Sequence, residues 1–300
     1  MSSNTYVPRG VEFGQKKREE NRKLISIGGI FKFLGLGLLL AFLIVPLIYN
    51  FTMAFKPLSE MIKYPPPIFV KNPTLQNFVD MFVVYANTEV PLLRYVFNSV
   101  WTTAVGMVCT VFVSILCGYA LAKLKVKSAT TIFNIIIASM MISLSTAAIM
   151  SYKITMWLGL YNTYAAFIIP YIANSSYVFL SRQFAEGIPD DLLEAARIDG
   201  ASEFKTFIVI AVPILRPAIA TIGLYSFNSL WGSSGPSGMY IVDEAKKNLP
   251  YALSNAIAGG LARQGAQAAM SLIMLLPSLI ALIITQSKVV DTMAHAGIKG

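Results

Sequence analysis

The sequence predicts an all-α integral membrane protein with six transmembrane helices, and three observations lead to this fold class. Charged residues make up 13% of the 300 residues and apolar residues 55%, with a mean hydropathy of +0.62; a soluble domain carries about 25% charged residues. The apolar residues form blocks near the roughly 20 residues that cross a bilayer core. These blocks are continuous, which disfavours a barrel of alternating strands.

Six apolar blocks define the expected spans. They cover residues 30–49, 97–121, 131–150, 163–180, 207–230 and 268–285. A basic N-terminal segment (1–29) precedes this six-helix domain (30–288), and a short tail (289–300) follows it. Because the basic segment is long and no small-residue cleavage site follows the first span, we expect an uncleaved anchor. Two long loops, 50–95 and 232–267, are expected on the outer side.

The distribution of basic residues predicts the orientation. With the N-terminus inside, the cytoplasmic segments hold fourteen Lys and Arg residues and the outer segments hold eight, as the positive-inside rule requires. Both termini and the loop 181–206 are then cytoplasmic. The net charge of +9 is thereby explained by membrane topology, and we expect no nucleic-acid partner.

The chain carries no recognisable catalytic or metal-binding set. Cys109 and Cys117 lie eight residues apart in one apolar block, about 12 Å along a helix, which is beyond disulfide reach. His295 stands alone. No ionisable residue lies centrally in a predicted span, although an ion-coupled carrier usually keeps one there. We therefore expect neither an enzyme nor an ion-driven carrier, and an energy source outside this chain.

The cytoplasmic loop contains a short helix signal at 189–200. Pro189 ends the preceding element, Asp190, Asp191 and Glu194 suit the positive end of a helix, and Gly200 suits a left-handed C-terminal cap. Leu192, Leu193 and Ala196 give the helix a narrow apolar face. The acidic polar face favours docking against a protein. An amphipathic connector on the lipid surface, which normally carries basic residues, is the alternative.

This loop also carries a family resemblance. Glu194-Ala195-Ala196, Gly200, Ile210 and Val212-Pro213 together resemble the EAA motif of ABC importer permeases, with Val212 in place of the usual leucine. The string 194–202 is similar to the carbohydrate branch, the maltose-permease G-type subunits. The segments Asn72-Pro73-Thr74-Leu75-Gln76-Asn77-Phe78 and Ala296-Gly297-Ile298-Lys299-Gly300 agree with it. The resemblance implies a type I importer permease architecture in a prokaryotic inner (plasma) membrane.

The resemblance also implies function and partners. No phosphate-binding loop of the Gly-x-x-x-x-Gly-Lys type is found, so this chain would bind no cofactor, and ATP and Mg would be bound by partner ATPase subunits. The expected partners are an ABC ATPase dimer, a second, homologous permease subunit (a heterodimer), an extracytoplasmic solute-binding protein and membrane lipid. The ATPase-coupling residues would be Asp191, Glu194, Ala195, Ala196, Arg197, Asp199 and Gly200.

The expected function is import of a mono- or oligosaccharide by alternating access. Another polar solute, or a stand-alone secondary carrier, is the alternative. A neutral sugar is best served by hydroxyl, amide and aromatic side chains, and five residues are candidates for its path: Ser143, Asn174, Tyr225, Asn228 and Trp231. Polar side chains at these places could equally join helices to one another.

Overall fold

A computed structural model describes residues 27–65, 67–86, 89–124, 126–172, 174–256 and 263–297. Every secondary-structure element in this described part is helical, which confirms the all-α fold class. The N-terminal segment up to residue 26, residues 257–262 of the second long loop and the last three residues of the tail lie outside the described residues.

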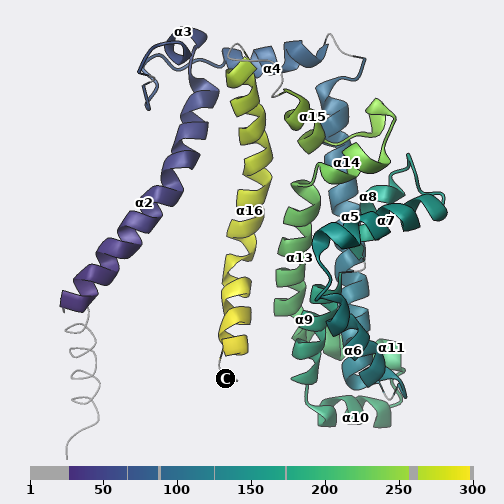
Figure 1. Cartoon of the computed structure of the whole chain (residues 1–300). Helices are drawn as coiled ribbons and strands as arrows, with labels where there is room; N and C mark the ends of the chain where they lie inside the picture. Colours follow the sequence, from purple (N-terminus) through teal and green to yellow (C-terminus); the bar gives the residue numbers. More distant parts are fainter. Residues whose placement is uncertain are drawn as a thin grey trace, which may run out of the picture.

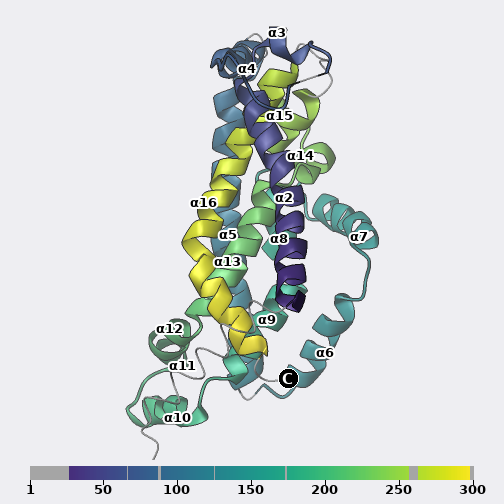
Figure 2. The ribbon, with the colours of Figure 1, turned by 90° about the vertical axis from the view of Figure 1, so that its left-hand side faces the viewer.

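The core of the molecule is a bundle built around one long helix, α5 (Leu92–Lys123). It packs against α8 (Ala165–Ile172), α9 (Ser175–Glu186) and α13 (Arg216–Trp231), and α13 packs in turn against α16 (Gln264–Gly297). Figures 1 and 2 show α5, α13 and α16 side by side along the length of the molecule. At about 1.5 Å per residue, α5 is long enough to cross a bilayer and extend beyond it.

The first membrane helix, α2 (Ile27–Phe55), lies at the edge of this bundle. It contacts α16 and α4 (Gln76–Ala86), and in Figure 1 it diverges from α16 as it runs away from the α4 end. None of the residues in its most apolar stretch is buried. An apolar helix of this kind needs lipid or another protein around it.

Three predicted spans are single apolar helices long enough to cross a membrane, namely Gly29–Phe55, Leu92–Lys123 and Gln264–Gln286. The fifth, 207–230, is bent by 78° between Glu203–Ile214 and Arg216–Trp231. The bend follows a π-helical turn, η1 (Phe207–Ala211), and lies between Pro213 and Pro217, which cannot donate backbone hydrogen bonds. The count of six spans stays a prediction.

The prediction of single helices over 131–150 and 163–180 is wrong. The first is divided into α6 (Ala129–Ser139) and α7 (Leu144–Trp157), where the Ser143 hydroxyl accepts the Thr146 N–H. The second is divided between α8 and α9, where the side-chain oxygen of Asn174 accepts hydrogen bonds from the backbone N–H groups of Ser176 and Tyr177. Both residues cap the following helix and so favour a new start over a continuation.

One end of the molecule is formed by short helices: α3 (Leu58–Met61), α4, α14 (Gly235–Tyr240), η2 (Glu244–Lys246) and α15 (Leu249–Ala256). Hydrogen bonds of the segment 72–78 and its neighbours connect the short helices at this end to α2. The amide of Asn77 donates to the carbonyls of Ala54 and Lys56, at 2.9 and 2.8 Å, near the end of α2. The carboxylate of Glu60 accepts the backbone N–H groups of Lys71 and Asn72.

The opposite end carries α10 (Asp190–Ile198), α11 (Glu203–Thr206), η1 and α12 (Val212–Ile214). In Figure 1, α10 lies across the tip of the bundle, below α9. This tip is called the α10 end below.

Helices α5 and α9 touch through a glycine, Gly118. A methyl group there would lie 2.7 Å from the backbone nitrogen of Arg182 and 2.5 Å from Ser181 Cβ, so the helices would have to separate. We expect Gly118→Ala to destabilise the subunit by about 1–3 kcal/mol, measured as a lower thermal midpoint in detergent. Gly106→Ala on the same helix is the control, since it meets only the flexible Leu230 side chain, at 2.8 Å. Equal midpoints for the two variants would contradict this packing.

Candidate functional site

The candidate site is α10, which forms where the sequence predicts a helix. Pro189 precedes it with extended backbone angles, Asp190 and Asp191 occupy its first turn, and Arg197 its last. Each charge therefore lies at the end of the helix dipole that stabilises it. Gly200 has a φ of +80°, the left-handed conformation that the sequence predicts for it.

One face of α10 is anchored in the bundle. The side chain of Leu193 is only 1% exposed and belongs to a buried cluster with residues of α5, α9 and η1, among them Tyr119, Ala185 and Phe207. Burial of such a leucine contributes about 1.5–3 kcal/mol. The α10 helix is therefore held against α5, α9 and η1 at once.

A salt bridge adds a second anchor at the N-terminus of α10. The ammonium group of Lys123, the last residue of α5, lies 2.7 Å from the Asp190 carboxylate and also donates to the Glu186 carbonyl at 3.4 Å. The Lys123 side chain is 8% exposed and that of Asp190 75%. The hydrogen bond from Lys123, and then its charge, lower the pKa of Asp190.

This salt bridge predicts a pH dependence. Because pairing lowers the folded-state pKa of Asp190, its stabilisation is complete above the pKa of the unfolded carboxyl and is lost as pH falls through the folded-state value. We expect α10 amides to lose hydrogen-exchange protection, after correction for the intrinsic rate, at pH values below 3.8. In Asp190→Asn that protection should be low at every pH. Asp191→Asn is the control, since Asp191 has no ion-pair partner in the described part of the chain; a matching loss there would contradict the assignment.

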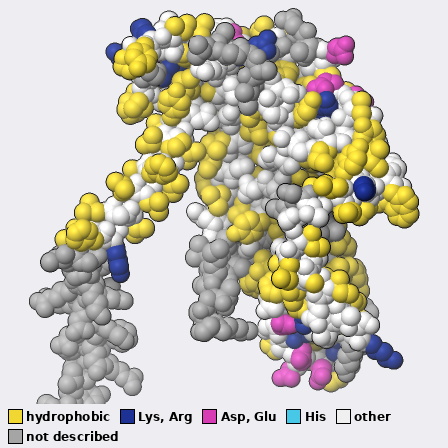
Figure 3. All heavy atoms as spheres, in the orientation of Figure 1, with side chains coloured by type: hydrophobic (Ala, Val, Ile, Leu, Met, Phe, Trp, Pro, Cys, Tyr) yellow, Lys and Arg dark blue, Asp and Glu magenta, His cyan; other side chains and the backbone are white. Residues whose placement is uncertain are grey.

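The other face of α10 points away from the bundle and is acidic with an apolar centre. Ile198 is 87% exposed, and Leu192 and Ala195 are also exposed, while Ala196 is half-buried. Arg197 forms a salt bridge with Glu203 of α11 at 2.8 Å. The exposed carboxylates are those of Asp191, Glu194 and Asp199. Figure 3 shows acidic side chains gathered at the α10 end.

This division corrects the expected apolar face of Leu192, Leu193 and Ala196. Leu193 packs inside its own subunit, and Ile198, which sequence reasoning did not select, is exposed in its place. Periodicity alone could not decide between them, because an amphipathic helix with apolar residues on two sides can turn either one inward.

The five residues proposed for a solute path lie in different settings. Tyr225 and Asn228 are exposed on α13, one turn apart. Trp231 is buried, and its indole N–H donates to the Met274 carbonyl of α16 at 2.8 Å. Ser143 and Asn174 cap α7 and α9 at the two helix breaks. The structure thus brings only Tyr225 and Asn228 together on one face.

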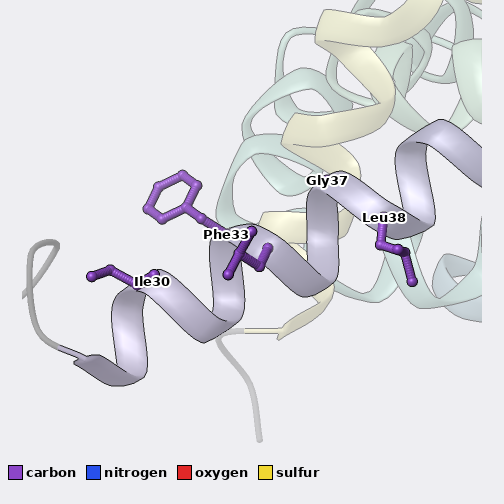
Figure 4. A pocket seen from close by; sticks show the side chains of 5 residues that line it. Ile30, Phe33, Gly37 and Leu38 are labelled. Carbon is purple, nitrogen blue, oxygen red and sulfur yellow. The ribbon is translucent and has the colours of Figure 1, made fainter.

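An open apolar depression of about 490 Å³ lies along α2 and offers no polar groups for a polar solute. It is lined by Ile30, Phe33, Leu34, Gly37 and Leu38. In Figure 4 the side chains of Ile30 and Phe33 extend from the helix into open space. This depression is part of the exposed surface of α2. No group of three or more potential metal ligands lies together among the described residues.

Comparison with known proteins identifies the family. Residues 111–287 match the family described as "Binding-protein-dependent transport system inner membrane component". The chain belongs to this family: it is a multi-pass inner-membrane transport subunit and not an enzyme. The segment that matches includes α10 and the bent pair of helices that follows it.

Two relatives and one solved structure align over most of the chain. The arabinooligosaccharides transport system permease protein AraQ of Bacillus subtilis is 29% identical over 88% of this chain and 96% of its own length. The sulfoquinovosyl glycerol transport system permease protein SmoH of Agrobacterium fabrum is 28% identical over 90% and 93%. A chain from a bacterial ABC transporter involved in the import of the acidic polysaccharide alginate has the same fold, with a TM-score of 0.77, 20% identity and coverage of 95% and 99%.

Proposed function

We propose that this chain is the permease subunit of an importer that moves a mono- or oligosaccharide into the cytoplasm, driven by ATP hydrolysis in partner subunits. The observation that carries the proposal is α10: its inner face is fixed to α5, α9 and η1, and its outer face presents Ile198, Leu192 and acidic groups. The names of AraQ and SmoH, which both refer to sugar-containing solutes, support sugar as the cargo.

The α10 end is proposed to face the cytoplasm and to seat α10 in a cleft of an ABC ATPase dimer that binds ATP and Mg²⁺. The coupling residues are Asp191, Glu194, Ala195, Ala196, Arg197, Asp199 and Gly200, with Ile198 added by its exposure. Closure of the ATPase dimer would then move α10, and the Leu193 and Lys123 contacts would carry that movement into the membrane helices.

The opposite end is proposed to meet an extracytoplasmic solute-binding protein, and α2 a second, homologous permease subunit. The binding protein is suggested by the family description. The second subunit is suggested by α2, whose apolar stretch is unburied in this chain. In a heterodimeric permease, the second subunit would cover that surface in place of lipid.

The solute path is proposed to follow the face of α13 that carries Tyr225 and Asn228, with Ser143 and Asn174 at the helix breaks. A phenol ring and an amide can stack on and hydrogen-bond to a sugar. Trp231 would act as a positioning residue, because its N–H already binds the Met274 carbonyl.

We expect the double variant Tyr225→Ala/Asn228→Ala to lower sugar import at least tenfold. ATP hydrolysis stimulated by the loaded binding protein should stay within twofold, because α10 is unchanged. The assay uses the whole importer in proteoliposomes with a sugar panel. Val100→Ala on α5, also exposed, is the control. Import of a solute other than a sugar would overturn the proposal that the cargo is a sugar. Unchanged import by the double variant would overturn the proposed solute path.

A further inference from the structure

A second concave surface lies beside the bend between α12 and α13. This groove has a volume of about 380 Å³ and is lined by α5, η1, α12 and α13. All ten lining residues are apolar or glycine, and they include Val108, Phe112, Ile208, Val212, Ile219 and Gly223. No side chain in this lining could hydrogen-bond a sugar, so the groove suits an apolar occupant.

Two features of the sequence create the groove. The 78° bend swings η1 and α12 away from the line of α13. Gly223 then leaves open space on α13, because a Cβ built there would meet only Val111, at 3.9 Å. The groove is therefore a consequence of the bend that connects α10 to the membrane helices.

The groove faces away from the proposed solute path. Tyr225 lies nine residues after Arg216 on α13, about two and a half turns, and therefore on the opposite side of the helix. Ile219 and Gly223 follow Arg216 by three and seven residues and share its side. The groove side of α13 is thus separate from the side that carries Tyr225.

A charge stands on the same side as the groove. Arg216 is exposed, and its side chain forms no hydrogen bond, ion pair or ring contact with any other described residue. As the first residue of α13 it lies at the positive end of the helix dipole, which disfavours a cation unless an anion is near. Arg216 begins α13 at the side of the α10 end. With the α10 end facing the cytoplasm, as the proposed function has it, Arg216 comes within reach of the headgroups of the inner leaflet.

We propose that this groove binds one anionic phospholipid of the inner leaflet, with an acyl chain against Ile219 and Gly223 and the phosphate on Arg216. The site rests on the orientation given with the proposed function. Anionic headgroups are attracted to basic side chains at this leaflet. The bound chain fills the angle of the bend and so holds η1, α12 and α10 in the arrangement seen here.

The test uses the assembled importer in nanodiscs of phosphatidylglycerol and phosphatidylcholine, with native mass spectrometry to count retained lipids. We expect one retained phosphatidylglycerol per permease chain. Gly223→Leu should lower its retention at least fivefold, since the new side chain fills the groove. Arg216→Gln should abolish the preference for phosphatidylglycerol over phosphatidylcholine while a lipid is still retained.

Two variants serve as controls. Ala138→Leu adds a leucine side chain on α6, where Ala138 is exposed, and Lys205→Gln removes an exposed cation from α11. Both should retain lipid as the wild type does. If Gly223→Leu fails to assemble, the headgroup preference of Arg216→Gln alone decides whether the lipid site exists.

Equal retention and equal headgroup preference in all four variants would overturn the site. Cross-linking of Gly223→Cys to a helix of the second permease would also overturn it, by showing that a protein fills the groove. Either result would leave the proposed function standing, because sugar import tests that function separately.

Discussion

Replacing Ile198 by glutamate is expected to abolish sugar import by separating the permease from its ATPase. Ile198 is 87% exposed, so Ile198→Glu leaves the fold of this subunit intact. Burial of an isoleucine contributes about 1.5–3 kcal/mol, and an unpaired carboxylate in its place is costly to bury. The measurement is the amount of ATPase that co-purifies with the tagged permease, which we expect to fall at least tenfold.

The matched control is Ile62→Glu, at the end of the molecule opposite α10. Ile62 is 65% exposed, so the same charge is added to a comparable apolar surface, and the ATPase should be retained. If Ile198→Glu retains the ATPase and imports sugar normally, the outer face of α10 does not dock an ATPase. Loss of the ATPase in both variants would show that added charge harms assembly in general.

Gly200→Pro is expected to abolish import and uncouple ATP hydrolysis while the subunit still inserts. The φ of +80° at Gly200 is inaccessible to proline, whose ring fixes φ near −65°. The substitution also removes the hydrogen bond from the Gly200 N–H to the Arg197 carbonyl, at 3.0 Å. Because Arg197 pairs with Glu203 across the same turn, the α10–α11 connection should change direction. Transport and ATP hydrolysis in proteoliposomes measure both effects.

Gly200→Asn tests whether the backbone conformation at this position matters for coupling, because it adds a side chain but can keep the left-handed conformation. Asparagine tolerates a left-handed conformation better than other side chains, and a Cβ at Gly200 would meet nothing within 4 Å. We expect this variant to keep at least half of the import rate. Normal import by Gly200→Pro would show that the turn does not contribute to coupling.

The parts of the fold that the sequence predicts well are those with local causes. The α10 helix and the left-handed Gly200 follow from Pro189, the acidic first turn and the glycine itself. The three long membrane helices follow from uninterrupted apolar runs. Each of these signals lies within the element that it specifies.

The parts that the sequence does not predict depend on residues far apart in the chain. The Lys123–Asp190 salt bridge joins residues 67 positions apart, and no local pattern indicates it. An apolar run also has the same composition whether it forms one helix or two, so the sequence does not show that Ser143 and Asn174 cap new helices. The choice of Leu193 over Ile198 as the inward residue depends on where α5, α9 and η1 pack.

The unburied apolar stretch of α2 has a consequence for how a cell must produce this protein. If a second permease subunit covers that stretch, as proposed, this subunit gains part of its stability only on assembly, and its folded fraction then depends on how much of the second subunit is present. Synthesised alone, the unassembled subunit would be degraded by membrane proteases, and matched production of both subunits would protect it. Its abundance would then be set by its scarcer companion more than by its own rate of synthesis.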